Sequence, residues 1–157
     1  MRSNAMRRRK SEDDLAPQSM SRKQVLDALR RGRSLIDADL RGTNLSGINF
    51  DGVDLAYTKL ADSDLSQCSF VGANLSGASM WHANLKNCAF DRSILDFADL
   101  DEANIDGCTF RGARIKKTIF PNARLAISMI EESIVAGTPV VLAREGESNE
   151  EDASLGD

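Results

Sequence analysis

The chain has few histidine, cysteine and aromatic residues, and it has no long hydrophobic run. Its 157 residues include one histidine and three cysteines, and no Cys-x-x-Cys pair occurs, so a zinc site is not expected. Aromatic residues make up 5% of the sequence and hydrophobic residues 41%, which predicts a core of aliphatic and small side chains. No run reaches the roughly 18 apolar residues that a membrane-spanning helix needs, so no membrane segment is predicted.

Catalytic and cofactor motifs are missing as well. A Ser-His-Asp set would have to use His82, the single histidine, and the glycines do not form the G-x-x-x-x-G-K pattern of a phosphate-binding loop. We therefore expect no enzyme activity, no cofactor and no metal. Residues 1–10 are basic but are followed by charged residues instead of the apolar segment of a secretory signal. Together with the unpaired cysteines, this indicates a reduced, cytoplasmic protein.

A large apolar residue, called here the central residue, recurs at every fifth position without a change of frame. A small or β-branched residue lies two positions before it, Asp or Asn often lies directly before it, and Gly often lies two positions after it. Val135 and Val140 continue the same spacing. The twenty central residues are Leu35, Leu40, Leu45, Phe50, Leu55, Leu60, Leu65, Phe70, Leu75, Met80, Leu85, Phe90, Leu95, Leu100, Ile105, Phe110, Ile115, Phe120, Leu125 and Ile130.

A period of five fits neither a helix nor a strand. Central residues would spiral around a helix, and they would alternate between the two faces of a strand. The chain must therefore turn after each group of five, so that every central residue stays inside. The recurring glycines support this interpretation, because the third residue of a type II turn has a positive φ angle that glycine adopts without strain.

A second period, of twenty residues, sets the number of sides. Four phenylalanines and all three cysteines recur at this interval, and twenty residues in groups of five make a coil with four sides. Coils stacked at about 4.8 Å would form a phenylalanine column and a neighbouring cysteine column inside. We predict small buried core residues for the cysteines, with a redox ladder as the alternative. The two columns are Phe50, Phe70, Phe90 and Phe110, and Cys68, Cys88 and Cys108.

The units ADLRG, ANLSG and ADLDE resemble the repeats of the pentapeptide-repeat family. The resemblance covers residues 33–142 and implies an all-β solenoid, a right-handed quadrilateral β-helix of about five coils. Some members of that family look like B-DNA in size and charge and bind DNA gyrase, which confers quinolone resistance. The segment from Asp37 to Asp106 has 12 acidic and 4 basic residues, which suits such mimicry. The uninterrupted frame and the short segment after it do not.

The segments on either side of the repeats are predicted to cap or to flank the solenoid. Ser21 and Gln24 form the pattern of a helix capping box, so residues 20–32 are expected to form a short capping helix over the first coil. Residues 1–19 and 143–157 are charged and are expected to be disordered, and residues 1–5 resemble the remnant of an expression tag.

Outward side chains provide the candidates for a binding site. Tyr57, Trp81 and Phe97 are predicted to lie near one corner, either as covers for the turns or as anchors for a protein partner. The next corner column holds Asp62, His82 and Glu102, which suggest either a solvated acidic face or a pH- or metal-sensitive site. A basic cluster lies near the end of the repeats and comprises Arg111, Arg114, Lys116, Lys117 and Arg124.

The leading hypothesis is a non-enzymatic module that presents a rigid surface to a protein partner. A DNA mimic that binds DNA gyrase or topoisomerase is the alternative, and a secreted bacterial effector is a third reading. Direct nucleic-acid binding is not expected, because no outward aromatic residue interleaves the basic cluster. The resemblance also implies a homodimer through the C-terminal end.

Overall fold

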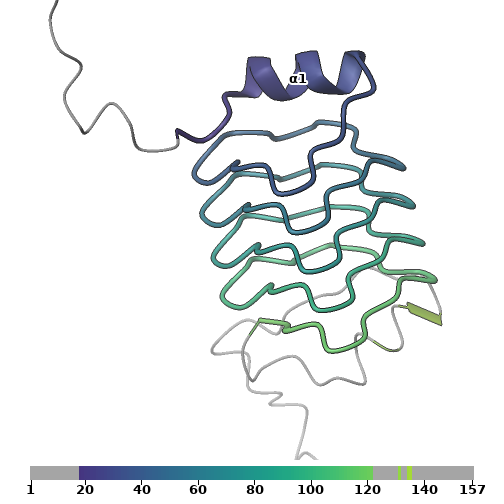
Figure 1. The fold of residues 1–157 in the computed structure, drawn as a ribbon. Coiled ribbons are helices and arrows are strands. Elements are labelled where there is room, and N and C mark those ends of the chain that lie inside the picture. Colours follow the sequence, from purple (N-terminus) through teal and green to yellow (C-terminus); the bar gives the residue numbers. More distant parts are fainter. Residues whose placement is uncertain (1–17, 122–130, 132–133, 136–157) are drawn as a thin grey trace, which may run out of the picture.

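One short helix lies across the end of a stack of four-sided coils (Figure 1). The computed structural model describes residues 18–121 together with residues 131, 134 and 135. Helix α1 spans Arg22–Arg30 and buries Val25 and Ala28. Its N-terminus has the expected capping box, because the Ser21 hydroxyl accepts from the backbone of Gln24 and the Gln24 side chain accepts from the backbone of Ser21.

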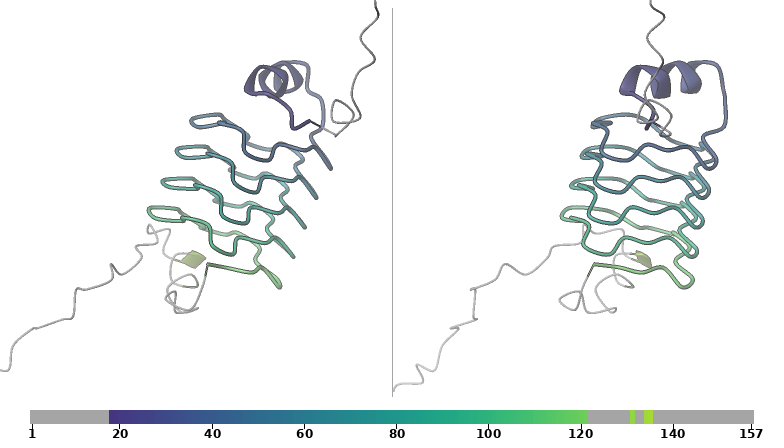
Figure 2. Two further views of the ribbon diagram at one scale, coloured as in Figure 1. Left: turned by 90° about the vertical axis from the view of Figure 1, so that its left-hand side faces the viewer. Right: turned by 60° about the vertical axis from the view of Figure 1, so that its left-hand side comes forward.

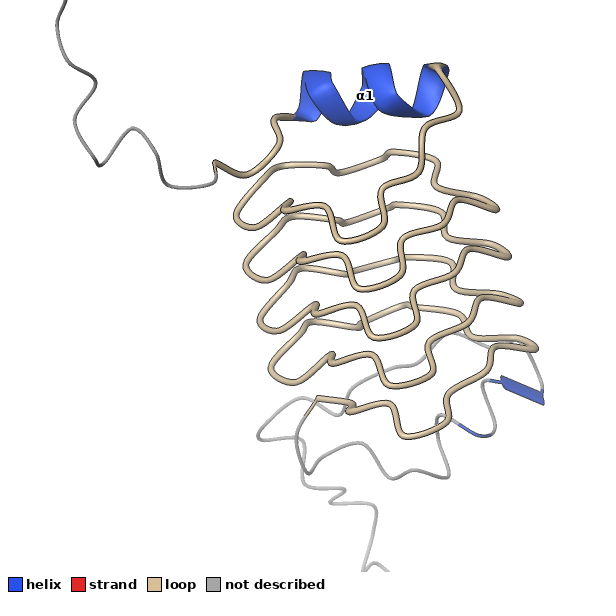
Figure 3. Cartoon of the chain, in the orientation of Figure 1, coloured by secondary structure: helices blue, strands red, loops and turns tan. Residues whose placement is uncertain are grey.

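The coils stack with the predicted period of twenty residues. All thirteen β-bridges of the described part are parallel, and each joins residues twenty positions apart, from Asp39 with Lys59 to Asp99 with Ile119. Figure 2 shows the coils stacked one on another, and Figure 3 draws them as loop because each side contributes a single bridging residue. Residues twenty apart therefore form columns along the stack, and the structure assigns every residue to one column.

A turn closes each group of five residues. The N–H three positions after each central residue donates to the central carbonyl, as between Ala38 and Leu35 at 3.0 Å and between Thr118 and Ile115 at 3.2 Å. The residue two positions after the centre has a positive φ of 54° to 70° in every described turn. Glycine occupies seven of these positions, and the other ten are Asp37, Tyr57, Asp62, Gln67, His82, Asn87, Arg92, Phe97, Glu102 and Lys117. The register of the coil, and not glycine alone, imposes this conformation.

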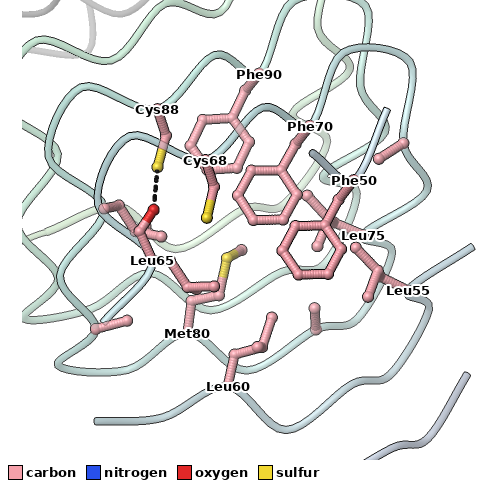
Figure 4. Close-up of a cluster of buried hydrophobic side chains, with 14 of the residues drawn as sticks. Phe50, Leu55, Leu60, Leu65, Cys68, Phe70, Leu75, Met80, Cys88 and Phe90 are labelled. Atoms are coloured by element: carbon pink, nitrogen blue, oxygen red, sulfur yellow. Dashed lines mark hydrogen bonds between the residues drawn. The ribbon is translucent and has the colours of Figure 1, made fainter. Parts of the chain in front are cut away.

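The central residues fill the inside of the coil. All sixteen from Leu35 to Phe110 are buried, and Ile115 and Phe120 pack partly buried against them. The phenylalanine column forms as expected, with ring centroids 5.1, 5.0 and 5.2 Å apart and planes within 5° of parallel (Figure 4). Stacked rings at this spacing attract one another beyond their burial.

The cysteine column lies beside the phenylalanines and is also buried. Its thiols are free, and the Cys68, Cys88 and Cys108 Sγ atoms lie 3.1, 3.0 and 3.0 Å from carbonyl oxygens one coil earlier. Figure 4 shows the bond from Cys88 to Leu65. Burial raises the pKa of Cys68 to about 12, so the thiol stays neutral and the cysteines act as small core residues.

Where Asp or Asn precedes a central residue, its side chain caps the following turn, a role that was not predicted from the sequence. The Asp39 carboxylate accepts from the backbone N–H of Arg41 at 3.2 Å, and the Asn74 amide oxygen accepts from that of Ser76 at 3.1 Å. Short Asp and Asn side chains reach a backbone N–H two residues on. This geometry explains why Asp and Asn recur at this position.

Part of the predicted solenoid falls outside the described residues. Leu125, Ile130, Val140 and most of residues 122–142 lie there, as do residues 1–17 and the acidic segment 143–157. The expectation for Val135 was wrong, because its side chain is 83% exposed and does not continue the inward series. No helix in the described part of the chain is long and apolar enough to cross a membrane.

Candidate binding face

One of the four sides of the stack carries most of the exposed large apolar residues. This side, called here the aromatic face, is built on the central residues Leu40, Leu60, Met80, Leu100 and Phe120. Its outward positions are the turn residues before the side, the bridging residues in its middle and the residues after its centres. In that order they are Asp37, Tyr57, Gly77, Phe97 and Lys117; Asp39, Lys59, Ser79, Asp99 and Ile119; and Arg41, Ala61, Trp81, Asp101 and Pro121.

The exposed large hydrophobic side chains gather on this one face. Tyr57 is 61% exposed, Phe97 57%, Ile119 54% and Trp81 45%. Ile36, which is 46% exposed, lies in the turn that leads into the face. The sixth exposed large hydrophobic residue of the described part is Val135, whose neighbour Ile134 accepts from Gly112 away from this face; among residues 33–121 the other three sides carry none.

The three aromatic residues line two edges of one side instead of one corner, so that expectation was wrong. The turn residues Tyr57 and Phe97 begin the side, whereas Trp81 follows its centre and lies on the opposite edge. Ser79 lies between the edges. The twenty-residue columns of the sequence already place Tyr57 and Phe97 on one edge and Trp81 on the other. They also place Ile119, which was not predicted as a site residue, on the same face.

The tyrosine ring lies flat against the next coil. A Cβ atom on Gly77 would come within 2.6 Å of Cδ1 of Tyr57, which is too close for any residue but glycine without a shift of the ring. One coil further, the Lys117 ammonium lies 5.7 Å above the centre of the Phe97 ring. Both interpretations of these aromatics therefore find support: the rings cover the turns, and they remain more than half exposed.

The opposite edge is bordered by the acidic corner, the column of Asp62, His82 and Glu102. The backbone N–H groups of Asp62 and His82 bond to the next coil, so the three side chains stack one per coil as expected. Nδ1 of His82 lies 2.7 Å from the Asp62 carboxylate, and the Trp81 ring lies 5.4 Å from the imidazole. No group of three potential metal ligands gathers in the described part of the chain.

Charged residues alternate along the middle of the face. Bridges place Lys59 and Asp99 on either side of Ser79. At the start of the stack, Arg41 forms a two-pronged ion pair with Asp39, with distances of 2.9 and 2.6 Å. The arginine lowers the pKa of Asp39, first through its side-chain hydrogen bonds. Aromatic residues are enriched at protein interfaces, so the exposed rings, and not the charged middle, are what favours a protein-binding surface here.

The basic cluster follows one side of the last described coil. Arg114 lies in the middle of that side, Arg111 and the pair Lys116 and Lys117 lie in the turns at its two ends, and Arg124 lies outside the described residues. Arg114 forms an ion pair with the buried Asp96 carboxylate. The described members therefore do not form a continuous basic stripe of the kind that tracks a nucleic-acid backbone.

The described cavities lie away from this face. One of about 400 Å³ lies between α1 and the first coil, where Gln24 and Arg31 are among its lining residues. His82, the only histidine, does not line it.

Replacing Tyr57 with glycine should leave stability almost unchanged. The φ of Tyr57 is 59°, a conformation that costs a non-glycine residue roughly 1–2 kcal/mol. Glycine would remove this strain while losing the contact of the ring with Gly77, so the free energy of unfolding should change by less than about 1 kcal/mol. Denaturant unfolding measures the change, and Gln67→Gly, at another left-handed turn, is the matched control. A loss above about 2 kcal/mol would mean that the ring is mainly a structural cover.

The repeats of this chain match a known family of repeat proteins. The family profile described as pentapeptide repeats matches in eight copies, over residues 34–70, 68–107 and 93–126. The comparison with curated sequences gave no match. The solved pentapeptide repeat protein alr5209 from Nostoc Pcc 7120 is 24% identical with a TM-score of 0.59, and the alignment covers 71% of this chain and 94% of that one. This likeness concerns the fold.

Two further structures align over shorter segments. A pentapeptide repeat protein of the Arabidopsis thaliana thylakoid lumen is 32% identical with a TM-score of 0.42, over 54% of this chain and 62% of that one. QnrB1, a plasmid-mediated fluoroquinolone resistance protein, is 17% identical with a TM-score of 0.43, over 57% and 56%. The chain therefore spans less than two thirds of either protein.

Proposed function

Because the chain belongs to the pentapeptide-repeat family and has its right-handed quadrilateral β-helix, we propose that it is a non-enzymatic protein-binding module whose partner docks on the aromatic face. The observation that carries this proposal is the separation of two sets of large side chains. The phenylalanine column is fully buried, whereas Tyr57, Trp81 and Phe97 remain exposed together on one side.

Packing alone does not account for the exposed set. Aromatic side chains dominate the energetics of protein interfaces, because they bury a large area at a small entropic cost. Tyr57 and Phe97 also adopt left-handed backbone conformations, with φ of 59° and 61°, that glycine would adopt at no cost. Non-glycine residues adopt the same conformation on every corner, so the size and exposure of the rings, and not the strain, support a binding role.

The acidic corner would serve as the rim of this surface. Asp62, His82 and Glu102 are exposed, so they would stay partly hydrated in a complex and contribute more to orientation and association rate than to affinity. The partner surface is therefore expected to place apolar side chains against the two edges of the face and charged groups against Lys59 and Asp99 in its middle.

The test compares two triple variants at similar positions. Tyr57→Ala, Trp81→Ala and Phe97→Ala together should abolish capture of a specific partner by the full chain, with a loss of at least about 100-fold in affinity. The control combines Gln67→Ala, Asn87→Ala and Arg92→Ala, which replace left-handed turn residues, as Tyr57 and Phe97 are, on other corners. The captured protein is then purified, and its affinity for the wild type and for each variant is measured by isothermal titration calorimetry. Equal loss in both variants, or retention in both, would contradict the proposal.

Mimicry of DNA is the second candidate, favoured by the 12 acidic and 4 basic residues between Asp37 and Asp106. Several of these carboxylates also bond backbone N–H groups, as Asp51 does to Val71 and Asp91 does to Arg111. A gyrase supercoiling assay tests the idea, and unchanged activity at micromolar protein would exclude it. The secreted-effector reading, the cytoplasmic location and a dimer through the C-terminal end remain predictions.

A further inference from the structure

The residues one coil before and one coil after Ser79 match in reverse on the aromatic face, whereas Asp39 and Ile119, two coils away, do not. Ser79 is the middle residue of the bridged column Asp39, Lys59, Ser79, Asp99 and Ile119. One coil before it lie Tyr57 and Lys59, and one coil after it lie Phe97 and Asp99. Aromatic therefore matches aromatic across Ser79, and a positive charge matches a negative one. The outermost turn residues, Asp37 and Lys117, continue the pattern with opposite charges.

We propose that the partner of the aromatic face is a second copy of this chain, docked antiparallel. This inference rests on the proposed function of the face. A two-fold axis would lie between the two copies, perpendicular to the stack and parallel to the segment of the third coil that contains Gly77, Ser79 and Trp81. Such an interface is isologous, so a residue one coil before Ser79 meets the residue one coil after Ser79 of the second copy.

The antiparallel arrangement pairs complementary groups in the centre of the interface. Lys59 would meet Asp99 of the second copy, and Asp99 would meet its Lys59, which gives two ion pairs. Tyr57 would meet Phe97 in the same reciprocal way. Trp81 lies at the level of the axis, so the Trp81 rings of the two copies would meet each other. The small Ser79 side chain of the same coil leaves room for them.

A parallel arrangement fits the same face less well. Its two-fold axis would run along the stack, so each bridging residue would meet its own copy at the same level. Lys59 would then oppose Lys59, and Asp99 would oppose Asp99. Like charges placed directly across an interface disfavour it. The charge pattern therefore selects the antiparallel orientation.

The area of the proposed dimer interface and the charges at its rim determine its affinity. Five coils at about 4.8 Å and a side of about 13 Å give a contact that buries on the order of 700 Å² in total, within the range of weak and transient interfaces. At the acidic corner Asp62 would lie opposite Glu102 of the second copy, and this exposed pair would repel. We therefore expect a reversible dimer with a dissociation constant on the order of 10–100 µM.

Charge exchange tests the pairing directly. Sedimentation of the full chain is measured for the wild type, for Lys59→Asp, for Asp99→Lys and for an equimolar mixture of the two variants. Each variant alone would bring like charges together, so its association should weaken at least about tenfold. In the mixture every central pair is again opposite in charge, so heterodimers should form with nearly wild-type affinity. Trp81, the only tryptophan, reports the contact by fluorescence.

Controls separate this inference from the proposed function. Lys86→Asp, on another side, should dimerise as the wild type does, and thermal unfolding verifies that each variant folds. A wild type that stays monomeric at millimolar concentration, or a mixture that does not restore association, overturns the dimer. If the triple aromatic variant nevertheless loses a different captured protein, the proposed function stands. If that variant dimerises and binds the captured protein as the wild type does, both the dimer and the proposed function are contradicted.

Discussion

Phe70→Ala is expected to lower the free energy of unfolding by about 3–5 kcal/mol. The Phe70 ring is fully buried and stacks on Phe50 at 5.1 Å and on Phe90 at 5.0 Å, so two stacking contacts disappear with it. The cavity would collapse poorly, because backbone hydrogen bonds hold the coils on both sides. These include the bonds from Phe50 to Ser69 at 2.7 Å and from Phe70 to Ala89 at 2.8 Å.

Denaturant unfolding with Phe70→Leu as the control measures this effect. Leucine is the residue that most other central positions carry, so this variant keeps the inward side chain and loses mainly the stacking and part of the volume. Its cost should be no more than about 2 kcal/mol. If alanine and leucine cost the same, or if alanine costs less than about 1 kcal/mol, the phenylalanine column does not stabilise the stack as described.

Ala78→Asp is expected to prevent folding, whereas Ser79→Asp is expected to be tolerated. Ala78 is fully buried and Ser79 is partly exposed, although the two residues are neighbours in the chain. A carboxylate at position 78 would enter the core without a cationic partner, and an unpaired buried charge costs several kcal/mol out of a total stability of about 5–15 kcal/mol. The same group at position 79 would point outward, between Lys59 and Asp99, whose opposite charges offset one another.

The pair is measured by circular dichroism and by thermal unfolding of both variants. The wild-type signal should persist in Ser79→Asp, with a change in stability within about 0.5 kcal/mol. Ala78→Asp should be unfolded at room temperature, or strongly destabilised until the carboxyl is protonated at low pH. Similar behaviour of the two variants would contradict the alternation of inward and outward residues.

Much of the fold could be predicted because two periods in the sequence are physically independent. The five-residue spacing requires a turn in each group, and the twenty-residue spacing of phenylalanine and cysteine requires four sides. Both follow from inward packing, which repeats in every coil. The capping box at Ser21 and Gln24 is equally local, so it could be identified before the helix was seen.

Other features could not be predicted in the same way. Glycine at some turns suggested that glycine supplies the positive φ, yet Tyr57 and Phe97 adopt it too, because the ladder bonds of neighbouring coils fix the turn. Outward residues carry no repeating signal, so the edge occupied by Trp81 and the place of Ile119 emerge only when the columns are drawn around a closed coil. The opposite charges of Lys59 and Asp99, one coil before and one coil after Ser79, likewise become apparent only from the columns.

Hydroxyl-radical footprinting of the full chain, read residue by residue by mass spectrometry, tests the register most directly. Aromatic and sulfur-containing side chains react readily where water reaches them. In dilute protein we predict oxidation of Tyr57, Trp81 and Phe97, together with protection of Met80 and of the phenylalanine and cysteine columns. Oxidation of Met80 or of those columns in the folded chain, or protection of the three exposed aromatic residues, would contradict the four-sided coil and the face built on it.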